Sequence, residues 1–516
     1  FAAFGNFVTP LQIGAIDMAF PRLNMMSYWL YLVGGLVMCA SFFFEAGAAK
    51  SGWTNYSPLA GFADSQVVNQ WKAGQTQWLL GMVFLITSSL LGAVNFLTTI
   101  INLRARGLTW FRLPFFVWAM LVTGFLLLLA FPPLEVAALM QLLDRTTGSS
   151  FFTPSGLYSK TAGLIEASGS GSPLLYQHLF WFLGHPEVYV LLLPGIACVA
   201  EIIPVNTRKP LWGYRSMVYA VIVLGFLSFI VWAHHMYLTG MGPVISTFFQ
   251  TTTVLISVPS VILLTSMIIS LWGGSIRFSV PMLWAAAFLP MFGIGGLTGL
   301  PLAFNLAGLH LHDTYYVIGH FHYVVAPGIL FGLFAGIYHW FPKATGRQMD
   351  NFLGHLHFWP SLVLMNVLFF PMLTQGMAGF HRRWYNGGEA YFEEEAINIF
   401  GNTVSDWVWL NPVMSWAAWL LALAQVPFII NFFGSIFFGK KIKNDNPWDA
   451  TTLEWATPTP PPHGNFTFDV AVYRGPYEYS RPDHPETDFF PQWEEPKRDA
   501  PAEKDAPTPE KEESQA

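Results

Sequence analysis

Long apolar stretches limit what this chain can fold into more than any other feature of its sequence. A helix that crosses the hydrocarbon core of a bilayer needs about 20 predominantly apolar residues. In lipid every backbone polar group must be bonded internally, so such a stretch forms a helix. The sequence therefore predicts an all-α, polytopic membrane helix bundle of about ten spans, roughly at 27–46, 76–101, 114–142, 173–203, 214–238, 249–275, 279–303, 314–342, 351–375 and 412–438. Residues 1–26 are expected to be the tail of an earlier helix followed by a polar loop.

The composition agrees with a lipid environment. Of the 516 residues, 53% are hydrophobic and only 11% are charged, whereas a soluble domain carries about 25% charged residues. The net charge of −6 is small and gives no reason to expect nucleic acid as a partner. The two cysteines, Cys39 and Cys198, lie inside apolar runs, so neither a disulfide framework nor a zinc site is expected.

Lysine and arginine gather in every second loop, which predicts the orientation of the chain. The positive-inside rule places such loops in the cytoplasm, so we expect an integral membrane protein with a cytoplasmic C-terminal tail. We further expect the membrane to be a bacterial cell (inner) membrane. The opposite loops are poor in cations apart from the pair Arg382–Arg383. The basic loops contain Arg104, Arg106 and Arg112; Arg208, Lys209 and Arg215; Arg277; Lys343 and Arg347; and Lys440, Lys441 and Lys443.

The composition also divides the chain into three parts. Residues 1–445 hold all of the apolar stretches and form the expected membrane domain. Residues 446–495 are polar and Pro-rich, which predicts an extramembrane cytoplasmic segment. Residues 496–516 form a Pro, Glu and Lys tail that cannot bury a core and is expected to be disordered.

Ionisable residues are costly in a bilayer, about 2.5–3.5 kcal/mol for a charged side chain at its centre, and the fourth, fifth and eighth spans each hold two or more. His185 and Tyr189 are four residues apart and share one face of a helix. Glu187 is two residues from each and points elsewhere. Pro186 is expected to kink this helix.

The other two spans contain pairs of histidines. His234 and His235 are adjacent, about 100° apart on a helix, so both can reach one metal only where the helix ends or is distorted. His320 and His322 point to nearly opposite sides, which suits two separate cofactors. Each histidine alone could be a buried residue bonded to its neighbours. Five of them in three spans favour metal binding, and imidazole suits copper and iron.

The longer strings around these residues resemble the heme–copper oxidase family, and specifically its subunit I. The resemblance runs from residue 1 to about residue 480. It rests on several strings taken together: Phe4-Gly5-Asn6, Asp17-Met18-Ala19-Phe20-Pro21-Arg22, Gly184-His185-Pro186-Glu187-Val188-Tyr189, Trp232-Ala233-His234-His235-Met236, His312-Asp313-Thr314-Tyr315-Tyr316, Gly319-His320-Phe321-His322-Tyr323 and Asn446-Pro447-Trp448-Asp449-Ala450-Thr451-Thr452-Leu453-Glu454-Trp455.

The resemblance implies a role for each of these residues. His185, His234 and His235 would hold the active-site copper (copper B), with His320 on the iron of heme a3 and His322 on the iron of heme a. Tyr189 would be joined covalently to His185 and supply an electron and a proton. Glu187 would also be catalytic, as the residue toward which the proton path from Asp17 leads. It further implies a magnesium ion at His312 and Asp313, heme propionates at Arg382 and Arg383, and a proton path through Asp17, Asn6, Asn24, Ser88, Ser89, Asn95, Thr253 and Ser260.

The chain departs from the family pattern at three places. Leu263 stands where relatives have a lysine on a second proton path, and a leucine cannot carry a proton. We hypothesise a bypass from Glu201 through water to Thr253 and Ser260; the alternative is that Glu201 is an ordinary interfacial carboxylate. Gly308 replaces a common aspartate near the predicted magnesium site. The family's first helix and most of its second are absent, so the second axial histidine of heme a is expected outside this chain.

The resemblance implies a terminal oxidase that reduces O2 to water and pumps protons. Its partners would be cytochrome c, a subunit II carrying a copper centre, subunit III and membrane lipid. Two alternatives stay open. One is a quinol oxidase of the same family, and the other, from a different class, is a cofactor-free membrane transporter, which Leu263 alone supports.

Overall fold

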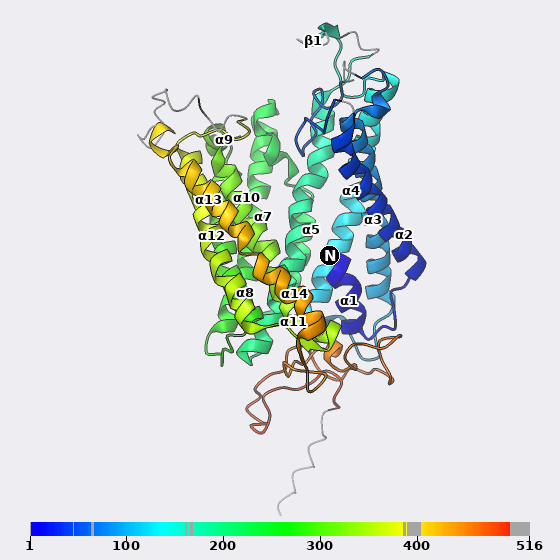
Figure 1. Cartoon of the computed structure of the whole chain (residues 1–516), viewed down its shortest axis with the longest axis vertical. Helices are drawn as coiled ribbons and strands as arrows, with labels where there is room; N and C mark the ends of the chain where they lie inside the picture. The colour runs from blue at the N-terminus through cyan, green and yellow to red at the C-terminus, as the bar shows by residue number, and fades with distance from the viewer. Residues whose placement is uncertain are drawn as a thin grey trace, which may run out of the picture.

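The computed structural model describes residues 2–44, 46–62, 67–159, 163–165, 169–384, 389 and 404–495. Within them the chain is a bundle of long helices that run along one axis, and the segment after residue 440 gathers at one end (Figure 1). The tail at 496–516 lies outside the described residues, so its disorder stays a prediction.

In the described part of the chain, 10 helical segments are long and apolar enough to cross a membrane, which confirms the predicted class and number. Several spans consist of more than one helical piece, and α9 joins two spans. The helices are α1 (Ala2–Ile13), α2 (Pro21–Ala40), α3 (Gly74–Asn102), α4 (Phe115–Thr147), α5 (Pro173–Thr207), α6 (Tyr214–Ser228), α7 (Gly242–Leu271), α8 (Val280–Ala303), α9 (Asn305–Leu311), α10 (Tyr315–Val325), α11 (Gly332–Thr345), α12 (Asn351–Met377), α13 (Leu410–Leu423) and α14 (Val426–Phe438).

Short elements complete the description. Two small antiparallel pairs are formed by β1 (Leu157–Ser159) with β2 (Gly163–Ile165) and by β3 (Arg347–Gln348) with β4 (Lys440–Lys441). The other pieces are the π-helical η5 (Ala326–Phe331) and the 3-10 helices η1 (Ser41–Phe43), η2 (Gln70–Lys72), η3 (Trp110–Arg112), η4 (Trp232–Thr239), η7 (Val404–Trp407) and η8 (Leu453–Trp455).

Two predicted span starts are wrong by more than a helical turn. The first span begins at Pro21 rather than near residue 27, and the sixth begins at Gly242 rather than near residue 249. Each has a proline within its first two helical positions, where the fixed φ and the missing N–H favour a helix start. The expected helical tail before the first span is α1, and the polar loop is limited to residues 14–20.

Glycines allow the closest helix crossings. A Cβ on Gly195 of α5 would collide with the carbonyl oxygen of Gly328 in η5, and a Cβ on Gly376 of α12 would collide with the amide of Tyr316 in α10. The span that carries His320 is therefore held in contact with α5 and with α12.

Residues 446–495 lie across one end of the bundle and bind its basic loops. Arg208 donates two hydrogen bonds to the Asp488 carboxylate, at 2.8 and 2.7 Å, and these bonds lower the pKa of Asp488. Lys343 donates to the Thr457 carbonyl at 2.8 Å. The basic loops thus lie at one end of the bundle, and their cytoplasmic side stays a prediction.

Candidate metal centre

Two of the predicted copper ligands lie where a membrane helix ends. α6 stops at Ser228, and the chain continues into the 3-10 helix η4, which carries His234 and His235. Met236 in η4 has non-helical backbone angles, with φ −125° and ψ 16°. The helix is therefore distorted here, which is the condition under which two adjacent histidines reach one point.

His185 of α5 completes the cluster. One ring nitrogen from each of His185, His234 and His235 lies within 4.8 Å of the other two. The His185 ring centroid lies 4.6 Å from that of His234, at right angles, and 5.7 Å from that of His235. Three converging imidazoles form a donor set that suits copper.

The hydrogen bonds of the cluster leave nitrogens available for a metal. The Nε2 atoms of His185 and His235 are buried and have no hydrogen-bond partner within the described chain. An unpaired buried polar atom costs about 1–3 kcal/mol, and a bound metal would remove that cost. His234 Nδ1 lies 2.9 Å from Thr253 Oγ1, which fixes its ring and leaves Nε2 as the ligand atom. These residues therefore fit a copper ion.

A tryptophan holds the third ligand in place. The ring of Trp181 stacks on His235 with centroids 3.8 Å apart and planes within 8°. Its indole N–H donates to the hydroxyl of Tyr56, in the loop before α3. Burial raises the pKa of Tyr56, against the lowering effects of the Trp181 bond and the Arg383 charge. A loop at one end of the bundle thus orients a ligand inside it.

α10 presents His320 and His322 to different neighbours, as their spacing predicted. His320 Nδ1 lies 2.9 Å from the Gly295 carbonyl of α8. His322 Nδ1 lies 2.9 Å from the Ile318 carbonyl, and its ring stacks on Phe369 of α12 with centroids 4.3 Å apart. With Nδ1 engaged, the Nε2 atom of each ring keeps its lone pair for a metal. Both residues fit the axial position of a heme iron.

The described residues around His322 supply no second histidine. The ring of Phe369 stacks on it, and the ring of Phe321 lies tilted beside it. The axial partner expected outside this chain therefore stays a prediction.

Tyr189 follows His185 by one turn of α5. Their ring centroids lie 5.0 Å apart, which confirms the predicted shared face. Glu187 is half-buried, and no hydrogen bond within the described residues links it to either ring. α5 runs through Pro186 without ending there.

The predicted magnesium and propionate residues meet at the end of the bundle away from the C-terminal segment. His312 Nε2 lies 3.5 Å from Asp313 Oδ2, and Arg382 Nε lies 3.3 Å from Asp313 Oδ1. Burial lowers the pKa of His312, opposed by the Asp313 charge. Arg383 is exposed beside this cluster.

Asp17, the predicted proton entrance, is exposed in the turn between α1 and α2. This turn lies against the C-terminal segment, because Asn465 Nδ2 donates to the Ala15 carbonyl at 2.8 Å. It also lies against the loop of Arg104, because the Ala105 amide donates to the Ile13 carbonyl at 2.8 Å. Asp17 is therefore at the basic end of the bundle, as predicted.

The polar row on α3 faces α2. The hydroxyls of Ser88 and Ser27 lie 3.2 Å apart, and Asn95 Oδ1 accepts a hydrogen bond from the Phe20 amide at 2.9 Å. Ser88 and Asn95 thus share one side of the helix, as their spacing predicted. This side contacts α2 and the turn before it.

Other residues of the predicted path make local contacts. Ser89 donates to the Leu85 carbonyl of its own helix at 3.0 Å, and Asn24 lies in the first turns of α2. Asn6 Oδ1 and Asn95 Nδ2 are buried without a hydrogen-bond partner in the described structure. Such atoms are where buried water binds.

The two residues of the predicted second path donate to their own helix. Thr253 donates to the Phe249 carbonyl at 2.6 Å and Ser260 to the Ile256 carbonyl at 3.3 Å. Leu263, the departure from the family pattern, is fully buried.

Glu201 is buried, so the alternative that it is an ordinary interfacial carboxylate is wrong. It is 3% exposed. Its oxygen accepts hydrogen bonds from the Tyr477 hydroxyl at 2.6 Å and from the Phe116 amide at 2.9 Å. The C-terminal segment covers it, and these bonds anchor that segment to α4 and α5.

Sequence reasoning missed one intramembrane carboxyl group, Glu135 of α4. Its Oε1 lies 2.6 Å from Thr87 Oγ1, which joins α4 to α3. An ionisable residue inside an apolar run is the signal that finds such a position.

Comparisons with known proteins agree with this geometry. Residues 1–437 match the family described as cytochrome c and quinol oxidase polypeptide I. Cytochrome c oxidase subunit 1 of Synechocystis sp. is 42% identical over 478 residues, covering 93% of this chain and 80% of the relative. Alternative cytochrome c oxidase subunit 1 of Bradyrhizobium diazoefficiens is 42% identical over 491 residues, covering 95% of this chain and 80% of the relative.

A solved structure shares the fold. It is described as a heme–copper terminal oxidase dimer and matches with a TM-score of 0.65 at 20% identity, over 86% of this chain and 74% of the other. The chain therefore belongs to the family of cytochrome c and quinol oxidase polypeptide I, membrane oxidoreductases of the heme–copper type.

Proposed function

We propose that this chain is the catalytic subunit of a terminal oxidase that reduces O2 to water, with electrons from cytochrome c and coupled proton pumping. The observation that carries the proposal is the convergence of three imidazoles from His185, His234 and His235, two of which have buried nitrogens without a protein partner. Family membership supports it, because the family implies heme and copper.

The metal ligands follow from the free ring nitrogens. His185, His234 and His235 would hold copper B, His320 the iron of heme a3, and His322 the iron of heme a. When bound, these groups supply the electrons that reduce oxygen. The chain's own part is to fix the ligands, through Thr253 on His234, Trp181 on His235 and Gly295 on His320.

Tyr189 and Glu187 supply protons at the site. Tyr189, one turn from His185, would be placed to give a proton and an electron for oxygen reduction, and the family resemblance implies a covalent link between its ring and His185. Glu187, half-buried on the same helix, receives protons that enter at Asp17 and pass Asn6, Asn24, Ser88, Ser89 and Asn95. Thr253 and Ser260 remain from the second path, which Leu263 interrupts.

The far end of the bundle would bind further groups. His312 and Asp313 would hold a magnesium ion, since imidazole and carboxylate are available there at one point. Arg382 and Arg383 would pair with heme propionates, because guanidinium binds carboxylates through paired N–H groups.

The proposed partners are a subunit II that carries a copper centre, subunit III and cytochrome c, in a bacterial inner membrane. The curated relatives described above are named cytochrome c oxidase subunits, which favours cytochrome c as the donor. The family description also includes quinol oxidases, so a quinol donor is the competing proposal.

An optical spectrum of the purified complex tests the function. Heme bands of two spin states are expected. A spectrum without heme bands would instead favour the alternative of a cofactor-free membrane transporter. Oxygen uptake with reduced cytochrome c, compared with uptake on a quinol, then identifies the donor.

A further inference from the structure

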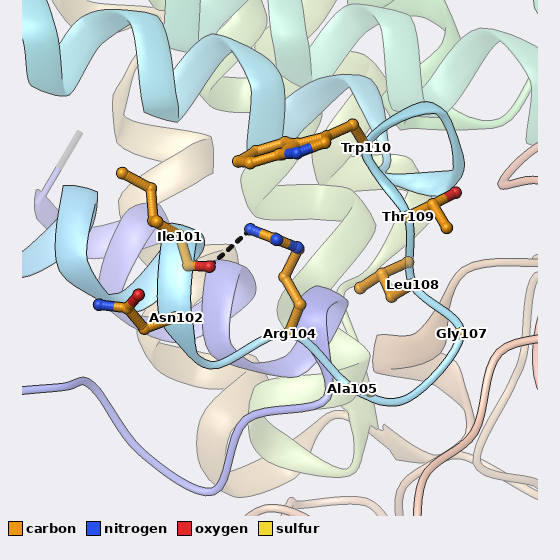
Figure 2. Close-up of a pocket in the computed structure, with 8 residues that line it drawn as sticks. All are labelled: Ile101, Asn102, Arg104, Ala105, Gly107, Leu108, Thr109 and Trp110. Carbon is orange, nitrogen blue, oxygen red and sulfur yellow. Dashed lines mark hydrogen bonds between the residues drawn. The ribbon is translucent and has the colours of Figure 1, made fainter.

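A polar cavity of about 370 Å³ opens where α3 ends, at the end of the bundle that carries the C-terminal segment. Figure 2 shows the guanidinium of Arg104 beneath the ring of Trp110, with Ile101 on one side and Leu108 on the other. Among the described residues, no carboxylate lines this cavity. None of the residues that line it is a proposed ligand of the metal centre.

Arg104 is fixed in position by three contacts. Its Nη1 donates to the carbonyl oxygens of Ile100 at 2.8 Å and Ile101 at 2.7 Å, which would otherwise be unpaired at the helix end. Its guanidinium carbon lies 3.9 Å from the ring centroid of Trp110. The side chain is therefore pre-organised, and its charge offsets the negative end of the α3 dipole.

The other edge of the guanidinium is unused. Arginine has five N–H donors, and the two bonds to the helix engage Nη1 alone. Within the described residues, Nε and Nη2 have no hydrogen-bond partner, and no carboxylate forms an ion pair with Arg104. The Nε–Nη2 edge offers two parallel N–H groups, the geometry that binds two oxygens of one phosphate.

The cavity is expected at the depth of lipid headgroups. The candidate membrane span in α3 ends at Asn102, so Arg104 is two residues beyond that span. Large apolar side chains are exposed around it, with Ile101 41%, Leu103 37% and Trp110 37% accessible. Tryptophan and arginine at this depth are typical of the membrane interface. An apolar rim beside a charged edge matches a molecule with both a phosphate and acyl chains.

The neighbouring cavity, of about 360 Å³, shares Arg104 and adds Arg106 and Asp469. Arg106 is exposed and makes no ion pair with the described residues, so it adds positive potential. The Asp469 carboxylate disfavours a phosphate on that side. The anion is therefore expected at Arg104, in the cavity without a carboxylate.

We propose that the Arg104–Trp110 cavity binds the phosphate of an anionic glycerophospholipid whose acyl chains lie along the exposed apolar surface at the end of α3. The same loop is bonded to α1, through Ala105 and Ile13, next to the turn of Asp17. A bound phosphate would raise the local proton concentration there; this consequence alone rests on the proposed function.

Native mass spectrometry of the detergent-purified complex tests the site without using enzyme activity. The complex is stripped of lipid and titrated with phosphatidylglycerol, with phosphatidylcholine or with inorganic phosphate. Arg104→Gln removes the paired N–H groups and should weaken phosphatidylglycerol binding about tenfold. Arg104→Lys keeps the charge without the paired edge and should weaken it less. Lys440→Gln, which removes an exposed cation at the same end of the bundle, should leave it unchanged.

Four results would overturn the proposal. The first is wild-type phosphatidylglycerol binding in Arg104→Gln, and the second is an equal loss in Lys440→Gln, which would mean non-specific attraction by charge. The third is displacement of the lipid by an equal concentration of inorganic phosphate, which would mean that the acyl chains contribute nothing. Tighter binding of phosphatidylglycerol than of phosphatidylcholine supports the anionic headgroup, and the reverse order contradicts it.

Discussion

The hydroxyl of Thr253 lies 2.9 Å from the Nδ1 atom of His234, so a helix that carries none of the proposed ligands orients one of them. Partners of this kind fix the tautomer and the ring of a metal-binding histidine.

Thr253→Val should therefore lower copper affinity about 10–100-fold, because the second ring nitrogen of His234 loses its partner. The measurement is copper retained by the complex during dialysis against a chelator. Thr251→Val is the matched control, since Thr251 is exposed on the same helix and bonds only to the Thr247 carbonyl. Equal retention in both variants would show that the hydroxyl does not orient the ligand.

Gly299→Ala should reduce heme content. A Cβ at Gly299 would lie 2.6 Å from Cε1 of His320 and push its ring out of place. Gly296→Ala on the same helix meets nothing within 4 Å, and should keep the wild-type heme content. Heme absorbance per protein checks both variants. An unchanged value for Gly299→Ala would contradict the role of His320 as a heme ligand.

The sequence predicted the parts of this site that depend on local geometry. The shared face of His185 and Tyr189 and the divergence of His320 from His322 follow from helix periodicity alone. The distortion that brings His234 and His235 together was predicted as a condition for shared metal binding, and η4 meets it.

Long-range contacts were not predictable in the same way. The Trp181–Tyr56 bond joins residues 125 apart in the chain, and no local pattern indicates it. The alternative interpretation of Glu201 was an ordinary interfacial carboxylate, but Tyr477, 276 residues later, covers it. The starts of two spans were misplaced, because the helices begin beside Pro21 and Pro243, ahead of the predicted apolar stretches.

Asp17→Asn should slow proton uptake and turnover while heme content stays at the wild-type level. Asp17 is the carboxylate in the exposed turn at the basic end, and an amide cannot take up and release protons at neutral pH. Proton uptake by the complex in lipid vesicles is the measurement, with Asp445→Asn, an exposed carboxylate at the same end, as control. Unchanged pumping in Asp17→Asn would remove this entrance from the account.

Glu201→Gln should leave oxygen uptake and the rate of heme reduction near wild-type values. The amide oxygen of glutamine accepts the same hydrogen bonds from Phe116 and Tyr477, and neither partner belongs to α7, the helix of Leu263. The contacts therefore favour a single proton path. A large loss of oxygen uptake in this variant, with stability intact, would instead support the bypass through Thr253 and Ser260.

Tyr477→Phe should lower stability by about 1–3 kcal/mol, because Glu201 loses a donor and the Phe115 amide loses the acceptor that it contacts at 2.7 Å. The measurement is the thermal stability of Tyr477→Phe and of Glu201→Gln, which does not depend on proton transfer. A Tyr477→Phe protein as stable as Glu201→Gln would contradict the anchoring role.

Acid should loosen the C-terminal segment. Hydrogen bonds from Arg208 lower the pKa of Asp488 in the folded chain, so this contact contributes stability above the ordinary aspartate pKa of about 3.9 and loses it as pH falls through the lower folded value. The protection of residues 470–490 against hydrogen exchange, relative to the intrinsic rate at each pH, should fall over that range. In Asp488→Asn, residues 470–490 should exchange faster than in the wild type already at neutral pH. Wild-type protection in this variant would mean that the ion pair does not hold the segment.

The copper-to-iron ratio of the purified complex, compared between wild type and His235→Ala, tests the central claim most directly. The account predicts that the variant loses one copper ion per chain, while both hemes and any copper on partner subunits remain. A variant with the wild-type ratio would contradict the assignment of His185, His234 and His235 as a copper site.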